Sequence, residues 1–172
     1  MGAKFFGARV ARLEDPVLLT GRGRFVGDIK LPGMLHAAFV RSPHAHARIR
    51  SITTSAARAV PGVHAALTAQ DLPARLATAQ IPMLVPNPAI TTPRTQRALA
   101  RDEVCFVGEA IAVVLAESRY AAEDAAAAVR IEFEPLPAVS DCRDAVAPGA
   151  PRVHGDVASN VAATIPLAYG NV

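Results

Sequence analysis

The chain has 172 residues, a formal net charge of +3, 51% hydrophobic residues and 5% aromatic residues. This length fits one ordinary domain that buries roughly two thirds of its unfolded surface, and the apolar content excludes an intrinsically disordered chain. No apolar run approaches the roughly 20 residues that cross a bilayer, and no targeting signal is recognisable, so we expect a cytoplasmic protein without a membrane segment.

Positive charge is concentrated in the first third of the sequence. Residues 1–58 carry ten Lys/Arg against three Asp/Glu, whereas residues 59–172 carry eight against twelve. A basic region can bind nucleic acid or an acidic protein, although arginines on a solvated face are the simpler interpretation. Few aromatic residues lie between the arginines to stack on bases, so we expect no nucleic-acid partner.

The first predicted element is one helical turn within residues 14–27. Asp15 is the expected N-cap, Pro16 follows at the first helical position, and Gly21 ends the turn. The spacing of Gly21, Gly23 and Gly27 is not that of a dinucleotide-binding fingerprint, and we interpret these glycines as turn residues.

Two strands are predicted next, over residues 34–41 and 46–52. The first is apolar on both alternating faces, which indicates a strand covered on both sides. The second alternates apolar residues with a basic outer stripe, and Ser42-Pro43 between the two suggests a hairpin-like pair. The arginines considered as a binding surface are Arg41, Arg48, Arg50 and Arg58.

His44 and His46 would share a face of a strand and could form a metal pair. No third ligand with local spacing follows them, and a catalytic zinc site requires three protein ligands. His36, His64 and His154 occur singly along the chain. Surface or hydrogen-bonded histidines are therefore the preferred interpretation, and we expect no metal site.

A short helix capped by Ser55 and a strand over Val63–Thr68 precede a long irregular segment. Five prolines exclude a long regular element from residues 71–102. A loop of this length is either functional or held by a partner. Its apolar stretch, Ile81–Val85, either packs on its own domain or docks on another chain.

Residues 103–137 carry the strongest pattern: strand, turn, strand, helix, strand. Val104–Val107 and the seven-residue apolar run Ala110–Ala116 are the first two strands, separated by Gly108-Glu109. Ser118 can cap a helix, and Pro135 ends the last strand. The apolar face expected for this helix consists of Ala121, Ala125, Ala128 and Val129.

The last strand of this nucleus, after Arg130 at the helix C-terminus, alternates Ile131 and Phe133 with Glu132 and Glu134. This period of two places the glutamates on a solvated outer face. Successive strand, helix and strand predict an α+β domain with a mixed sheet. Beyond it we expect a helical turn at Cys142–Val146 and a possible strand over residues 160–169.

No local signature for catalysis is visible. The sequence lacks G-x-S-x-G and any local Ser, His and Asp set, so acyl transfer is unsupported. Cys105 and Cys142 are the only cysteines, whereas a [2Fe-2S] cluster requires four ligands. We expect both to be reduced thiols. The predicted catalytic, cofactor-binding and metal-binding residues are accordingly none.

The sequence as a whole resembles the N-terminal α/β-hammerhead domain of the molybdenum-containing large subunit of the xanthine dehydrogenase and aldehyde oxidase family, including the aerobic carbon monoxide dehydrogenase type. The matching stretches follow one another along nearly the entire chain: residues 12–52, 61–73, 102–139, 147–154 and 159–162. The resemblance implies a mixed sheet with short helices inserted between strands, which agrees with the pattern of elements above.

The resemblance also implies a function carried by a larger assembly. In that family a molybdopterin cofactor hydroxylates carbon centres or oxidises carbon monoxide, and electrons pass through two [2Fe-2S] clusters to FAD. The family's pterin contacts and its glutamate lie in domains that follow the hammerhead, so no catalytic residue is transferred to this chain. The resemblance leaves open an excised domain, a split subunit or a remnant.

On this basis we expect one domain over residues 1–172, with a core at about 20–140, the Pro-rich loop at 71–102, and a tail at 147–172 that leads toward an absent cofactor-binding domain. The expected partners are a molybdopterin-binding chain, an iron-sulfur subunit and an FAD subunit. We expect the chain alone to be inactive. The alternative is a stand-alone binding module that uses the basic N-terminal region.

Overall fold

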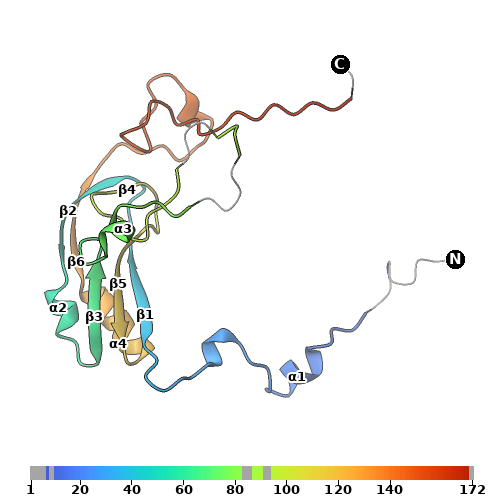
Figure 1. The fold of residues 1–172 in the computed structure, drawn as a ribbon, viewed down its shortest axis with the longest axis vertical. Helices are drawn as coiled ribbons and strands as arrows, with labels where there is room; N and C mark the ends of the chain where they lie inside the picture. The colour runs from blue at the N-terminus through green and yellow to red at the C-terminus, as the bar shows by residue number, and fades with distance from the viewer. Residues whose placement is uncertain (1–6, 8–9, 83–86, 91–93, 171–172) are drawn as a thin grey trace. The chain divides into compact units, whose positions relative to one another are not determined.

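The computed structural model describes residues 7, 10–82, 87–90 and 94–170. The chain divides into two compact units, Met1–Met34 and Leu35–Val172, which are considered separately below (Figure 1). None of the described helices combines the length and the apolar character needed to cross a membrane.

The first unit contains helix α1, Asp15–Leu19, and a 3-10 helix at Val26–Asp28, and none of their residues is buried. The predicted helical turn is confirmed, but its N-cap is Glu14, not Asp15. Gly21 has a φ of 68°, a left-handed conformation that favours glycine after a helix. A Cβ at Gly23 would lie 2.6 Å from the Leu18 side chain, so this glycine permits a close approach of the chain.

Sheet A, in the second unit, has the strand order β1-β5-β3, with β1 at His36–Arg41, β5 at Ala110–Ala116 and β3 at Val63–Thr68. Both pairings are antiparallel. The predicted bounds of β3 and β5 are confirmed. For β1, the prediction of cover on both faces is wrong within this unit, because its residues alternate between partly buried and exposed.

Sheet B has the order β4-β2-β6, with β4 at Glu103–Val104, β2 at Ala47–Thr53 and β6 at Arg130–Pro135. The mixed sheet expected from the sequence is thus two antiparallel sheets of three strands. β1 and β2 do not form the predicted hairpin, because Ser42 bonds elsewhere. Its N–H donates to the Glu109 carbonyl and its carbonyl accepts from the Gly108 N–H.

Two short helices cover one face of sheet A. Helix α4, Arg119–Ala128, packs on β1 and β5, and helix α2, Ser55–Arg58, packs on β3 and α4 (Figure 1). The predicted cap of α4 is confirmed, since Ser118 Oγ accepts the Ala121 N–H at 3.1 Å. The cap predicted for α2 is wrong, because Ser55 is its first residue and Thr54 precedes it.

Two hydrophobic clusters form the core. One joins the helix-facing side of sheet A to α2 and α4 through Ala66, Val114, Ala57 and Ala125. The other lies under sheet B around Ala47, Val104 and Ile111. Ile52 of β2 and Ile131 of β6 contact both clusters, so sheet B and the helices lie on the same side of sheet A.

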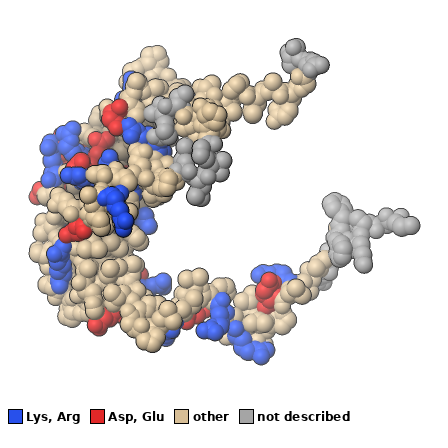
Figure 2. Space-filling model, in the orientation of Figure 1, with Lys and Arg blue, Asp and Glu red and all other residues tan. Residues whose placement is uncertain are grey.

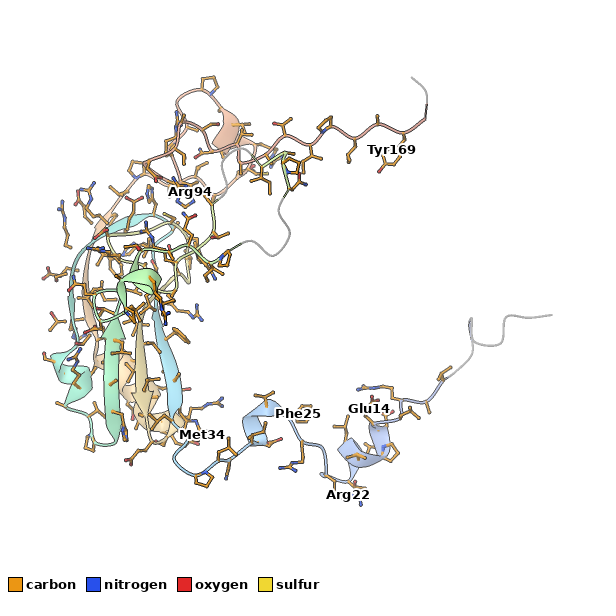
Figure 3. All side chains as sticks on the ribbon, viewed as in Figure 1. Glu14, Arg22, Phe25, Met34, Arg94 and Tyr169 are labelled. Atoms are coloured by element: carbon orange, nitrogen blue, oxygen red, sulfur yellow. The ribbon has the colours of Figure 1, made fainter. Side chains whose placement is uncertain are left out.

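Segments outside the sheets are mostly irregular. Helix α3, Ala74–Ala77, lies within the predicted loop, and a 3-10 helix at Asp144–Val146 confirms the predicted turn. The strand suggested over residues 160–169 is wrong, because its one β-bridge in the described residues joins Ala163 to Ile90. Tyr169, 86% exposed, lies on an extended run of chain (Figure 3).

Candidate functional site

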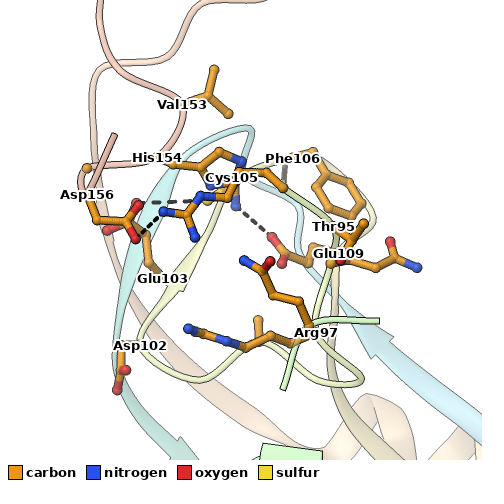
Figure 4. Close-up of a pocket in the computed structure, with 15 residues that line it drawn as sticks. Thr95, Arg97, Asp102, Glu103, Cys105, Phe106, Glu109, Val153, His154 and Asp156 are labelled. Carbon is orange, nitrogen blue, oxygen red and sulfur yellow. Dashed lines mark hydrogen bonds and ion pairs between the residues drawn. The ribbon is translucent and has the colours of Figure 1, made fainter. Parts of the chain in front are cut away.

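A cavity of about 610 Å³, lined mainly by polar residues, lies beside the turn between β4 and β5 (Figure 4). Its walls come mainly from three segments: residues 94–97, residues 100–109, which include the turn 105–109, and the tail segment 153–156. The ionisable groups that line it are Arg94, Arg97, Asp102, Glu103, Cys105, Glu109, His154 and Asp156. Eight ionisable side chains therefore line a single concave surface.

The turn at one wall is built by glycine and by a carboxylate. Gly108 has a φ of 90°, a conformation that other residues rarely adopt. Glu109 Oε2 accepts the Cys105 backbone N–H at 2.6 Å, which removes this group from the strand ladder. Strand β4 therefore ends at Val104, three residues earlier than the sequence pattern predicts.

Burial governs the electrostatics of this turn. It raises the pKa of the Cys105 thiol to about 12, and the neighbouring carboxylates of Glu109 and Glu103 add to the effect. Burial also raises the pKa of Glu109, although the Cys105 N–H partly opposes it. Cys105 is thus a protonated thiol at neutral pH, unsuited to act as a nucleophile or as a thiolate ligand.

His46 lies behind the cavity wall and connects three segments. Its Nδ1 lies 2.7 Å from the Pro137 carbonyl oxygen and its Nε2 lies 2.8 Å from Glu103 Oε1. Burial lowers the pKa of His46, but the two hydrogen bonds and the charge of Glu103 raise it more, and the net shift is upward. We expected His46 on the basic outer stripe of its strand, but its side chain is only 11% exposed and lies among these partners.

Arg94 ties the Pro-rich loop to the C-terminal tail. Its Nη2 donates to Asp156 Oδ2 at 2.5 Å, and its Nε is buried without a partner in the described residues. Two residues 62 positions apart in sequence are thereby joined at the wall of the cavity. This contact joins two charged side chains that are distant in sequence, so the local periodicity of the sequence cannot predict it.

The cavity offers hydrogen bonds and charge but no assembled reaction centre. No group of three His, Cys, Asp or Glu side chains suited to a metal ion occurs in the described ranges. The sequence pointed to Cys105 only as an expected reduced thiol and missed the cavity, because His154 and Asp156 come from a tail without a recognisable motif. Polar recognition is the chemistry that this arrangement supports.

The two histidines considered as a metal pair have separate environments. The His44 ring contacts the Phe133 ring edge to face, with 4.8 Å between centroids, whereas His46 is bound to Glu103 and Pro137. His64 lies 3.2 Å from a Glu117 oxygen. In this structure His46 and His64 are thus hydrogen-bonded, and His44 packs on an aromatic ring.

The four arginines considered as a binding surface already have partners within the chain. Two carboxylates, Glu134 and Asp71, offset part of their positive charge, whereas the carbonyl partners offset none. The partners are the Gly108 carbonyl for Arg41, Glu134 for Arg48 and Arg50, and Asp71 with the Ala66 carbonyl for Arg58.

The apolar segments considered as docking surfaces are only partly described. Residues 83–86 of the stretch Ile81–Val85 and its flank lie outside the described residues, and Ile81 is 45% exposed. In the tail, Ile165 is 55% and Leu167 is 77% exposed. These three apolar side chains are thus largely in contact with solvent in this structure.

Comparison with known proteins identifies what the chain is similar to. The family model described as "Aldehyde oxidase and xanthine dehydrogenase, a/b hammerhead domain" matches residues 20–137. The chain is 44% identical to the carbon monoxide dehydrogenase large chain of Afipia carboxidovorans over 88% of its own length and 18% of that protein. It is 34% identical to the xanthine dehydrogenase molybdenum-binding subunit of Escherichia coli O157:H7, over 94% and 21%.

A solved structure agrees with these matches. The chain superposes on quinoline 2-oxidoreductase from Pseudomonas putida 86 with a TM-score of 0.77 and 42% identity. The superposition covers 91% of this chain and 20% of that one. The predicted hammerhead fold is confirmed, and the chain spans about a fifth of the length of the proteins it matches.

Proposed function

Since the chain belongs to the aldehyde oxidase and xanthine dehydrogenase a/b hammerhead domain family, we propose that it is a non-catalytic structural part of a molybdopterin-dependent hydroxylase or dehydrogenase. It acts as a domain or a separate subunit that supports the molybdenum-binding part of the large subunit. The observation that carries the proposal is the match itself, which includes nearly all of this chain but only about a fifth of each relative.

The side chains of this unit do not fit the redox groups of such an enzyme. A [2Fe-2S] cluster takes four ligands, usually thiolates, and the two cysteines of the sequence are 37 positions apart. The pKa of Cys105, about 12, keeps its thiol protonated, and Cys142 is exposed. We therefore place the molybdopterin, the [2Fe-2S] clusters and FAD on other parts of the complex.

The proposed partners are a molybdopterin-binding chain, an iron-sulfur subunit and an FAD subunit, assembled in the cytoplasm. Two free cysteines are in keeping with a reducing compartment. The exposed apolar side chains of Ile81, Ile165 and Leu167 support contact with such partners, because exposed apolar groups on a lone domain gain stability only when they are covered.

The proposal is tested by metal analysis of the tagged chain, produced alone and together with the molybdenum-binding polypeptide from the same organism. We expect no stoichiometric molybdenum with the chain alone, and a molybdenum-containing complex of higher mass after co-expression. Turnover of an oxidisable substrate by the purified chain alone, with stoichiometric molybdenum, would overturn it.

A further inference from the structure

The face of sheet A that lies away from the helices is built only of apolar side chains at its centre. Register places Phe39 and Leu67 on either side of Val113, and Ala37 and Ala65 on either side of Leu115. The intervening row includes Ala66 and Val114, which pack against α2 and α4. Because alternate residues of a strand point to opposite faces, the six residues form the outer face of sheet A.

No described residue of the unit packs this outer face into either hydrophobic cluster. Phe39 is 48% exposed, and Val113, Leu115 and Leu67 are only partly buried. In Figure 1, α4 lies behind the strands of sheet A, and in Figure 2 the surface over these strands is mostly uncharged, with charged side chains at its margin. An antiparallel sheet with one solvated face normally carries polar residues there.

Arg41 is the charged side chain beside Phe39, but it does not make the outer face polar. Arg41 donates to the Gly108 carbonyl at 2.9 Å, and its guanidinium lies 5.4 Å from the centre of the Phe39 ring. It therefore borders the apolar rows and contacts one of them. A surface of this kind matches an apolar partner and gives no attraction to an acidic one.

The size of the outer face argues against a second copy of this chain. Three strands about 4.8 Å apart and two rows of side chains about 7 Å apart cover roughly 200 Å². A stable dimer buries about 800 Å² on each partner. The face is large enough to contribute to a contact within one subunit, where other segments of the chain add further area.

We infer that the outer face of sheet A binds an apolar surface of the remaining part of the molybdenum-binding large subunit. The inference rests on the proposed function, and it assigns the occupant from length: about four fifths of each relative lies outside the match. Covering this face makes β5, apolar along its whole length, a strand buried on both sides, as its sequence pattern predicts.

The test compares charged substitutions on the outer faces of the two sheets. Phe39→Glu and Ala37→Glu place a carboxylate on sheet A, and Thr53→Glu places one at an exposed position of β2 in sheet B. Each tagged variant is co-expressed with the molybdenum-binding polypeptide, and the amount of complex is measured. We expect the two sheet A variants to reduce the complex roughly tenfold or more, and Thr53→Glu to leave it unchanged.

Circular dichroism of each variant alone controls for folding. Ala37→Glu adds a carboxylate to the same face without removing a large side chain, so it separates the effect of charge from the loss of the Phe39 ring. Equal complex formation by folded sheet A variants and by Thr53→Glu overturns the inference. The inference is also overturned if analytical sedimentation shows that the chain alone forms a dimer and that Phe39→Glu dissociates this dimer. Failure of wild type and Thr53→Glu alike to form any complex overturns the proposed function itself, together with the occupant assigned here.

Discussion

The outer faces of the two sheets differ in chemistry although both sheets have three antiparallel strands. On sheet B the outward residues are polar: Glu134 pairs with Arg48 and Arg50, and Ser51 Oγ donates to Glu132 at 2.8 Å. On sheet A the central outward residues are all apolar. A sheet whose outer charges neutralise one another is suited to water, whereas an apolar outer face is suited to cover by protein.

The sequences of the strands differ in the same way as the outer faces of the sheets. β2 and β6 alternate apolar and polar residues because one face of each meets water. β5 has no polar residue, yet only one of its faces is packed inside this unit. The apolar sequence of β5 is therefore typical of a strand buried on both faces, and the helices of this unit cover one of them.

The largest effect is expected when the two faces of β5 are compared directly. Val114 is fully buried against Ala66 and Ala125, whereas Val113 is on the outer face. Val114→Asp should cost at least about 3 kcal/mol of unfolding free energy, or prevent folding, because it buries an unpaired charge. Val113→Asp should cost about 1 kcal/mol, since its carboxylate can reach water.

Urea denaturation of the isolated chain measures both values. The two substitutions change the same residue type at neighbouring positions, so each is the control for the other. Equal losses of stability would mean that the outer face is already covered within the chain, and would remove the distinction between the two sheets.

Local periodicity accounts for how much of the fold the sequence could predict. The bounds of β3 and β5 and the Ser118 cap follow from patterns within a few residues. The sheet that each strand joins does not follow from such local patterns. β1 and β2 are neighbours in sequence but lie in different sheets, because Ser42 between them bonds to the turn at Glu109.

The cavity could not be predicted for a related reason. Cys105 and Glu109 are close in sequence, but Arg94 meets Asp156 across 62 positions without a motif on either side. His46 was considered for a metal pair on spacing alone, whereas its actual partner, Glu103, lies 57 positions away. Contacts at such separation depend on the packing of loops, which leaves no period in the sequence.

Substitution of His46 should have an intermediate effect on stability. His46 directly precedes β2 and bonds to Glu103 of β4, so it tests the charged interactions around sheet B. Burial lowers its pKa, but the bonds to Glu103 and Pro137 raise it more, so the folded pKa exceeds the unfolded value of about 6.5. The stabilisation is complete below that unfolded value and is lost as pH rises through the folded pKa. His46→Gln should thus cost on the order of 1–2 kcal/mol near pH 6, and less near pH 8.

Denaturation at several pH values between about 5.5 and 8.5 provides the measurement. The raised pKa of Glu109 also makes stability fall with rising pH, but it is common to both proteins and cancels in their difference. His64→Gln is the matched control, because His64 and Glu117 are 51% and 70% exposed. A loss that stays constant with pH would contradict the proton linkage of His46.

The smallest effect is expected on the outer face of sheet B. Glu134 is 40% exposed and its partners Arg48 and Arg50 are about half exposed, so solvent screens both ion pairs. Glu134→Gln should lower the unfolding free energy by less than about 1 kcal/mol, and by less still at high salt. It should also leave assembly with the molybdenum-binding polypeptide unchanged. Loss of the complex in this variant would mean that sheet B, too, is covered by a partner, because a solvated ion pair has no role in holding one.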